Sequence, residues 1–174
     1  MREIGIPLQV HAANINEDQI AGEAPIAYAL RLAQEKAQAV AGQYPQSYVL
    51  GADTIVVIDG EVLGKPQDHA DAARMLRLLS GRAHEVTTAV SLIATGTLEE
   101  TRASTTKVYF REIAEAEIQQ YVAGGEPMDK AGAYAIQGGA SRWTDRIEGE
   151  FSNVVGLPLS LVTEMLKITG LMKS

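Results

Sequence analysis

The sequence contains no cysteine, few aromatic residues, a deficit of positive charge and no long apolar run. The absence of cysteine excludes disulfide scaffolds, thiol catalysis, zinc fingers and iron–sulfur clusters. Fifteen Lys and Arg residues against 22 Asp and Glu residues give a net charge of −7. This balance argues against a general binder of nucleic acid or acidic membranes, because phosphate backbones require a basic surface. A few local lysines could still bind a small phosphate group.

No apolar segment reaches the length of a membrane span, and no secretory h-region is present, so we expect a cytoplasmic protein without a membrane partner. Hydrophobic residues make up 46% of the 174 residues and charged residues 21%. This composition predicts a single globular domain over residues 1–174. Because aromatics are only 5%, we expect a core built mainly from Ala, Val, Leu and Ile.

Hydrophobic spacing and end signals predict helices interleaved with strands, some of them joined by hairpins. This order is typical of an α/β fold with a mixed sheet. The expected helices cover residues 23–41, 68–80 and 115–123 and a segment starting at Pro158; the expected strands cover residues 47–58, 61–63, 84–95, 101–110 and 143–147. An apolar stripe is predicted on the first helix, formed by Ile26, Leu30, Ala33, Ala37 and Val40.

Asp53 is the first candidate for chemistry, because a carboxylate in an apolar strand is costly unless it is paired or binds a metal. A purely structural Asp at a strand bend is the alternative. Gly51 and Ala52 leave space beside it, Thr54 adds a hydroxyl, and the predicted hairpin returns Lys65 toward the same strand. A carboxylate and a lysine placed together could hold a phosphate–metal group, with the Asp activating a water.

Lys36 lies at the edge of the first helix's apolar stripe and on periodicity alone is a snorkelling lysine. Arg31 and Glu35 have the spacing of a surface ion pair. Residues 129–139 suit either a ligand-contacting loop or a flexible surface loop, and residues 153–158 are interpreted as a strand–turn–helix entry. Residues 60–65 fail as a P-loop, since Pro66 replaces the required Ser or Thr.

The three histidines, His11, His69 and His84, lack metal-ligand spacing and are interpreted as structural or exposed. Reasoning from the residues alone therefore ends at a one-domain α/β protein with an Asp/Lys phosphate–metal site.

The same segments, in their order and spacing, resemble the Maf family of nucleoside triphosphate pyrophosphatases over nearly the whole chain. The matching segments are residues 31–37, 51–54, 64–66, 80–88, 129–138 and 152–158. The resemblance implies a Maf/ITPase-like fold of two lobes around an extended mixed β-sheet with a central cleft. It also implies metal-dependent hydrolysis between the α- and β-phosphates, with Mg²⁺ or Mn²⁺ as the cofactor, and a homodimer.

The resemblance places roles on individual residues of this sequence. Asp53 falls at the general-base position, and Lys36 and Lys65 fall at phosphate-contacting positions. Glu17 matches an acidic position near the metal, to which Asp53 also belongs. Thr54 and Gln137 match the pair that marks the branch acting on dTTP and UTP, with modified pyrimidine nucleotides as further candidate substrates.

One part of the family pattern has no counterpart. The family opens with a strand and a Ser-x-Ser-Pro-Arg-Arg loop that grips the phosphates, whereas Met1–Pro7 resemble the end of the helix that follows this loop. We therefore expect an N-terminally truncated chain. The alternative function is a catalytically impaired Maf-like protein that binds nucleotides or regulates cell division at the septum.

Overall fold

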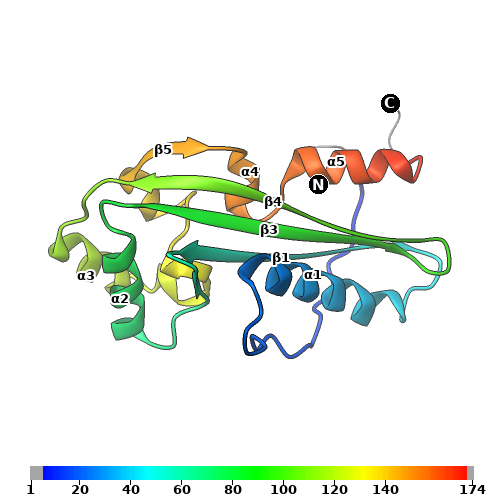
Figure 1. Ribbon diagram of the computed structural model, residues 1–174, viewed down its shortest axis with the longest axis horizontal. Helices are drawn as coiled ribbons and strands as arrows, with labels where there is room; N and C mark the ends of the chain where they lie inside the picture. Colours follow the sequence, from blue (N-terminus) through cyan, green and yellow to red (C-terminus); the bar gives the residue numbers. More distant parts are fainter. Residues whose placement is uncertain (1–5, 172–174) are drawn as a thin grey trace. The chain divides into compact units, whose positions relative to one another are not determined.

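The computed structural model describes residues 6–171, and its elements follow the predicted order (Figure 1). The helices are α1 (Pro25–Ala41), α2 (His69–Leu79), α3 (Glu115–Ala123), α4 (Phe151–Val155) and α5 (Leu159–Ile168), and the strands are β1 (Tyr48–Ile58), β2 (Glu61–Leu63), β3 (Ala83–Ala94), β4 (Leu98–Phe110) and β5 (Thr144–Glu148). Short 3₁₀ turns follow α3: η2 (Glu126–Asp129), η3 (Ala131–Ala133) and η4 (Gly139–Trp143). Among residues 6–171, none of the helices combines the length and apolar character that a bilayer crossing requires.

The strands form one sheet in the order β2-β1-β3-β4-β5. β1 pairs antiparallel with β2, and β4 pairs antiparallel with β5. The adjacent long strands β1, β3 and β4 also alternate in direction (Figure 1). The prediction of a mixed sheet was therefore wrong. Hairpins join β1 to β2 and β3 to β4, and the longer connections through α2 and α3 also return the chain antiparallel to its neighbour in the sheet. The first predicted hairpin turns at Asp59 and Gly60, whose φ values of 52° and 83° suit a type I′ turn.

The chain divides into two compact units, which share the three long strands. Unit 1 contains the chain up to Asp53, Ala89–Ala103 and the chain from Leu159 onward; unit 2 contains Thr54–Thr88 and Ser104–Pro158. In unit 1, α1 and α5 lie on opposite faces of the sheet (Figure 1). Its core is aliphatic and rich in alanine, as the composition predicts.

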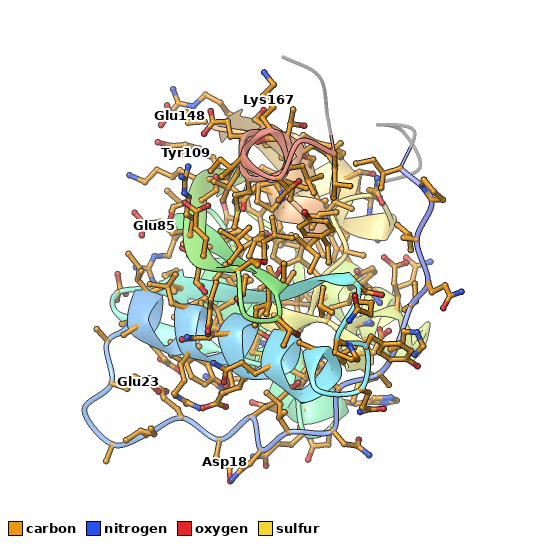
Figure 2. The ribbon with its side chains drawn as sticks, turned by 90° about the vertical axis from the view of Figure 1, so that its right-hand side faces the viewer. Asp18, Glu23, Glu85, Tyr109, Glu148 and Lys167 are labelled. Carbon is orange, nitrogen blue, oxygen red and sulfur yellow. The ribbon has the colours of Figure 1, made fainter. Side chains whose placement is uncertain are left out.

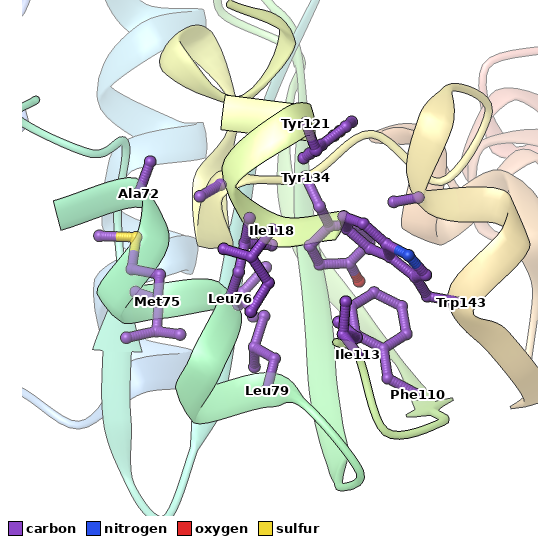
Figure 3. Close-up of a cluster of buried hydrophobic side chains, with 14 of the residues drawn as sticks. Ala72, Met75, Leu76, Leu79, Phe110, Ile113, Ile118, Tyr121, Tyr134 and Trp143 are labelled. Atoms are coloured by element: carbon purple, nitrogen blue, oxygen red, sulfur yellow. The ribbon is translucent and has the colours of Figure 1, made fainter. Parts of the chain in front are cut away.

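The core of unit 2 instead contains four aromatic side chains, those of Phe110, Tyr121, Tyr134 and Trp143 (Figure 3). Trp143 is fully buried, and its ring meets those of Tyr121 and Phe110 edge to face, with centroids 4.8 and 6.2 Å apart. Tyr134 completes the group against Phe110. Such aromatic contacts add to the stabilisation from buried area. The buried aromatic rings of the described residues therefore lie together in this core.

Two local predictions need correction. Of the stripe predicted on the first helix, Ala33 and Ala37 are buried as expected, but Ile26 is 53% exposed. The helix buries Ala29 and Leu32 in its place. Residues 151–155 form α4, where the start of a strand–turn–helix entry was expected. Of the N-terminal segment that resembles a helix end, Met1–Gly5 lie outside the described residues, and Ile6 and Pro7 are irregular.

Candidate active site

The close approach of α1 to β1 begins at Gly51. A Cβ built on Gly51 would lie 2.5 Å from the Ala33 carbonyl oxygen and 2.7 Å from the Ala37 amide nitrogen. Only a residue without a side chain permits this backbone contact. Asp53 lies two residues further along β1, on the same face of the strand. The sequence thus brings a carboxylate directly under α1.

Lys36, on α1, is the centre of a charged cluster in unit 1. Its Nζ lies 2.7 Å from Asp53 Oδ1 and 2.7 Å from Glu17 Oε1. The Asp53 side chain is 10% exposed and that of Lys36 20%. Burial opposes the charge of the ammonium, but the hydrogen bonds to Asp53 and Glu17 outweigh it, so the pKa of Lys36 is raised. The lysine therefore stays charged between two carboxylates, instead of only snorkelling beside the apolar stripe.

Glu17 belongs to the segment before α1, and two side chains of α1 hold this segment in place. Tyr28 Oη donates a hydrogen bond to the Glu17 carbonyl oxygen at 2.6 Å. Arg31 donates to both carboxylate oxygens of Glu23, at 2.8 and 2.9 Å, and to the Asp18 carbonyl oxygen at 3.1 Å. Figure 2 shows Asp18 and Glu23 on this segment as it passes beside the helix. The predicted Arg31–Glu35 pair is present at 3.3 Å.

Tyr28 lies close enough to the cluster for the charged carboxylates to affect the pKa of its hydroxyl. Burial raises the pKa of the Tyr28 hydroxyl, and the nearby carboxylates of Asp53 and Glu17 raise it further. The phenol is therefore neutral at physiological pH and serves as a hydrogen-bond donor. Its role in placing Glu17 was not predicted, because an 11-residue separation within an irregular segment gives no periodic signal.

The two carboxylates fit a divalent cation only as part of a ligand set. Within residues 6–171, no group of three or more His, Cys, Asp or Glu side chains could hold a metal alone. Mg²⁺ is commonly bound by one or two protein carboxylates, with substrate phosphates and water supplying the other oxygens. Glu17 and Asp53 match that donor chemistry. A metal at this place would then be held jointly with a phosphate-bearing substrate.

Thr54, the residue after Asp53, begins unit 2 and lies on the opposite face of β1. Its Oγ1 is 2.9 Å from Oγ1 of Thr88, whose hydroxyl in turn donates to the Asn153 carbonyl oxygen at 2.9 Å. Thr88 and Asn153 are both fully buried. Sequence reasoning did not find this hydrogen-bonded chain, because its members come from β1, β3 and α4.

Lys65 and Gln137, also in unit 2, are both exposed. Lys65 follows β2, where the Gly64 carbonyl oxygen accepts a hydrogen bond from the Gly132 amide at 3.0 Å. Asp129 has a lowered pKa, mainly through its hydrogen bond from Lys130, and the charge of Lys65 contributes. Gln137 lies in the turn before η4. Within the described chain, neither side chain makes a hydrogen bond or ion pair, so both are available to a ligand.

The glycine-bearing stretch around Gln137 is an ordered segment of short turns. Tyr134 and Ile136 are buried in the core of unit 2. Gly132, at φ 68°, lies so close to Val56 that a Cβ would come within 2.8 Å of it. Of the two interpretations of this stretch, a free surface loop is thereby excluded.

The histidines do not contribute to the cluster. His84 is 2% exposed and its Nε2 lies 2.8 Å from Tyr134 Oη. Burial lowers the pKa of His84 to about 4, so the ring is neutral at pH 7. His11 is exposed against Tyr44, and His69 is the exposed first residue of α2. Their interpretation as structural or exposed residues is confirmed.

Comparison with known proteins gives a consistent result. A family model described as Maf-like protein matches residues 1–169. A protein of Koribacter versatilis named dTTP/UTP pyrophosphatase is 51% identical over 172 residues, which cover 99% of this chain and 89% of that protein. Proteins of the same name from Geobacter metallireducens and Symbiobacterium thermophilum are 51% and 49% identical, covering 95% and 98% of this chain and 87% of each relative.

Proposed function

The chain belongs to the Maf family, and from that premise we propose that it hydrolyses dTTP and UTP to the nucleoside monophosphate and pyrophosphate. The observation that carries the proposal is the Lys36 ammonium, which lies 2.7 Å from each of two carboxylates. Such a cluster can accept a proton, and its carboxylates can hold a divalent cation that offsets the charge of a triphosphate. The names of the relatives supply the nucleotides, dTTP and UTP, and the reaction, which is that of a pyrophosphatase.

In this proposal Asp53 is the general base. Its carboxylate takes a proton from a water whose oxygen attacks the α-phosphorus, and the bond from that phosphorus to the bridging oxygen breaks. The electron pair leaves with the pyrophosphate. The hydrogen bond from Lys36 orients the carboxylate. Ionised Asp53 is the form able to accept a proton.

Lys36 and Lys65 contribute positive charge toward the phosphates, which spread negative charge as the reaction proceeds. Glu17 and Asp53 would hold Mg²⁺ or Mn²⁺, which when bound neutralises phosphate charge and polarises a phosphoryl oxygen. The segment carrying Glu17 is fixed to α1 through Tyr28 and Arg31. Because the segment is attached in this way, the Glu17 carboxylate is already in position when substrate binds.

The base would be selected in unit 2 by Thr54 and Gln137. Both offer polar groups of the kind that pair with a pyrimidine edge, and the exposed Gln137 amide is not engaged by the described part of the protein. A site that pairs with one base edge rejects another strongly, because the mismatched polar groups lose their partners.

The test is pyrophosphate release from dTTP, UTP, dATP and GTP, measured with Mg²⁺ and with Mn²⁺. We expect kcat/KM for dTTP and UTP to exceed that for either purine by at least tenfold. Equal rates on all four nucleotides would contradict the base selection, and absence of release from every nucleotide would contradict the activity. Sedimentation of the same preparation tests the homodimer that we propose with it.

A further inference from the structure

The backbone carbonyl of Asn153 is fixed by the amide of the same residue. Asn153 Nδ2 donates to the Val86 carbonyl oxygen at 2.9 Å and to Thr106 Oγ1 at 3.0 Å. The Thr106 hydroxyl donates its own proton to the Glu150 carbonyl oxygen at 3.1 Å, so it accepts from Asn153. An amide turned the other way would place its oxygen against the Val86 carbonyl, so the orientation is determined.

This arrangement determines where the Thr88 proton lies. Thr88 Oγ1 is 2.9 Å from the Asn153 carbonyl oxygen, and a carbonyl has no proton to offer. The Thr88 hydroxyl must therefore donate there, because two oxygens at this distance without a hydrogen between them would repel. The single proton of Thr88 is used by this bond.

The proton of Thr54 follows from the same reasoning. Thr54 Oγ1 lies 2.9 Å from Thr88 Oγ1, and Thr88 has no second proton to donate. Thr54 must donate to Thr88, which leaves only lone pairs on its own oxygen. The order of donation runs from Thr54 to Thr88 to the Asn153 carbonyl. Toward any ligand, Thr54 is consequently an acceptor.

Thr54 also differs from Thr88 in its exposure. Thr54 is partly exposed, whereas Thr88 is fully buried and cannot itself touch a ligand. Gly156 lies beside it: a Cβ there would be 3.5 Å from Thr54 Oγ1, and a longer side chain would cover the hydroxyl. The φ of 113° at Gly156 disfavours any residue with a side chain.

We infer that Thr88 and Asn153 are positioning residues that make Thr54 an acceptor, so that the site selects pyrimidines carrying an N–H at ring position 3. Uracil and thymine carry this N–H, whereas cytosine has a lone pair at the same position. Two lone pairs facing each other repel and leave both groups unpaired. The inference rests on the proposed function, in which a pyrimidine lies against Thr54, and it adds discrimination against cytidine nucleotides.

The experiment compares kcat/KM for pyrophosphate release from UTP, CTP and N3-methyl-UTP. For the wild-type protein we expect UTP to exceed each of the other two by at least tenfold. Thr88→Val keeps the side-chain shape but frees the Thr54 proton, which can then be donated to cytosine. The UTP-to-CTP ratio should fall at least fivefold in Thr88→Val and stay within twofold of wild type in Thr88→Ser.

A matched control lies one residue away. Thr87 is buried in the same strand, and its hydroxyl is 2.8 Å from that of Thr105, apart from the Thr54 chain. Thr87→Val should leave the UTP-to-CTP ratio within twofold of wild type. A general loss of packing would lower activity in both valine variants and would not change the ratio in Thr88→Val alone.

The failures are distinguishable. If the wild type releases pyrophosphate from UTP and CTP equally, the inference is overturned and the proposed function stands. An unchanged ratio in a folded Thr88→Val overturns the role of Thr88. Absence of release from UTP overturns both proposals. If Thr88→Val does not fold, the wild-type comparison with CTP and N3-methyl-UTP decides the matter alone.

Discussion

The backbone of Gly51 lies against that of Ala33, where a Cβ at position 51 would be 2.5 Å from the Ala33 carbonyl oxygen. One turn along the same helix, Lys36 reaches Asp53 at 2.7 Å. The ion pair therefore depends on a helix–strand distance that glycine alone permits. A small backbone contact sets the geometry of a charged cluster.

Gly51→Ala should accordingly push α1 from β1 and separate Lys36 from Asp53. We expect pyrophosphatase activity to fall at least tenfold and the free energy of unfolding to fall by about 1–3 kcal/mol, as for other overpacked positions. Gly42→Ala is the control, because Gly42 has an ordinary φ of −59° and a Cβ there meets nothing closer than 4.0 Å. Activity assays and urea unfolding would measure both; a fully active Gly51→Ala would show that this spacing is not required.

Asp53→Asn keeps the side-chain shape but removes the proton acceptor. We expect folding to be retained and pyrophosphate release from dTTP to drop by about 10²–10⁴-fold, the usual contribution of a general base. Asp59→Asn is the matched control, since Asp59 is paired with Arg82 at 2.7 Å in the hairpin turn, outside the cluster. Near wild-type turnover by Asp53→Asn would remove Asp53 from the proposed mechanism.

Lys36→Gln removes the ammonium that lies between the carboxylates of Glu17 and Asp53. Because the cluster is partly exposed, we expect a loss of about 1–2 kcal/mol in the free energy of unfolding at pH 7. A divalent cation can take the place of the ammonium, so millimolar Mg²⁺ or Mn²⁺ should restore part of this loss. Lys130→Gln, which breaks an exposed pair with Asp129, is the control and should show no such restoration. Thermal unfolding with and without the metal gives the answer.

Acid should destabilise unit 2 through His84. The pKa of His84 is about 4 in the folded state because of burial, against about 6.5 in an unfolded chain. Between these values the unfolded state binds a proton that the folded state does not, so stability falls as pH drops from about 6.5 to 4, by at most about 3 kcal/mol. His84→Gln, which can still hydrogen-bond Tyr134, should flatten this pH dependence in urea titrations. The exposed His69→Gln should leave the dependence as in wild type.

Elements bounded by strong local signals were predictable from the sequence. α3 occupies the predicted residues 115–123, ended by Gly124 and Gly125. α2 begins after Asp68, whose side chain accepts a hydrogen bond from the Asp71 amide as an N-cap should. The burial of Ala29 and Leu32 in place of Ile26 was not predictable, because the packing of α1 against β1 at Gly51 decides which side chains of the helix face the core.

The candidate site likewise combines residues that the sequence identifies with residues that it does not. An Asp in an apolar strand is unusual by itself, and Asp53 was identified on that ground before its partners were known. Lys36 was ambiguous, because helical periodicity describes the apolar face and is silent about a carboxylate 17 residues away. Asn153 was missed because its contacts with Val86 and Thr88 span 65 or more residues. No local pattern records pairings of that range.

The division of the chain into units has a consequence for its synthesis. The last residue of unit 2 is Pro158, whereas unit 1 also includes the later segment that carries α5. During translation the residues of unit 2 are therefore all present before those of unit 1. The Lys36–Asp53 pair is made from early residues, yet the core around Val162 and Met165 that completes its unit is made last. A ribosome stalled before residue 159 would carry every residue of the charged cluster on a unit that lacks its final helix.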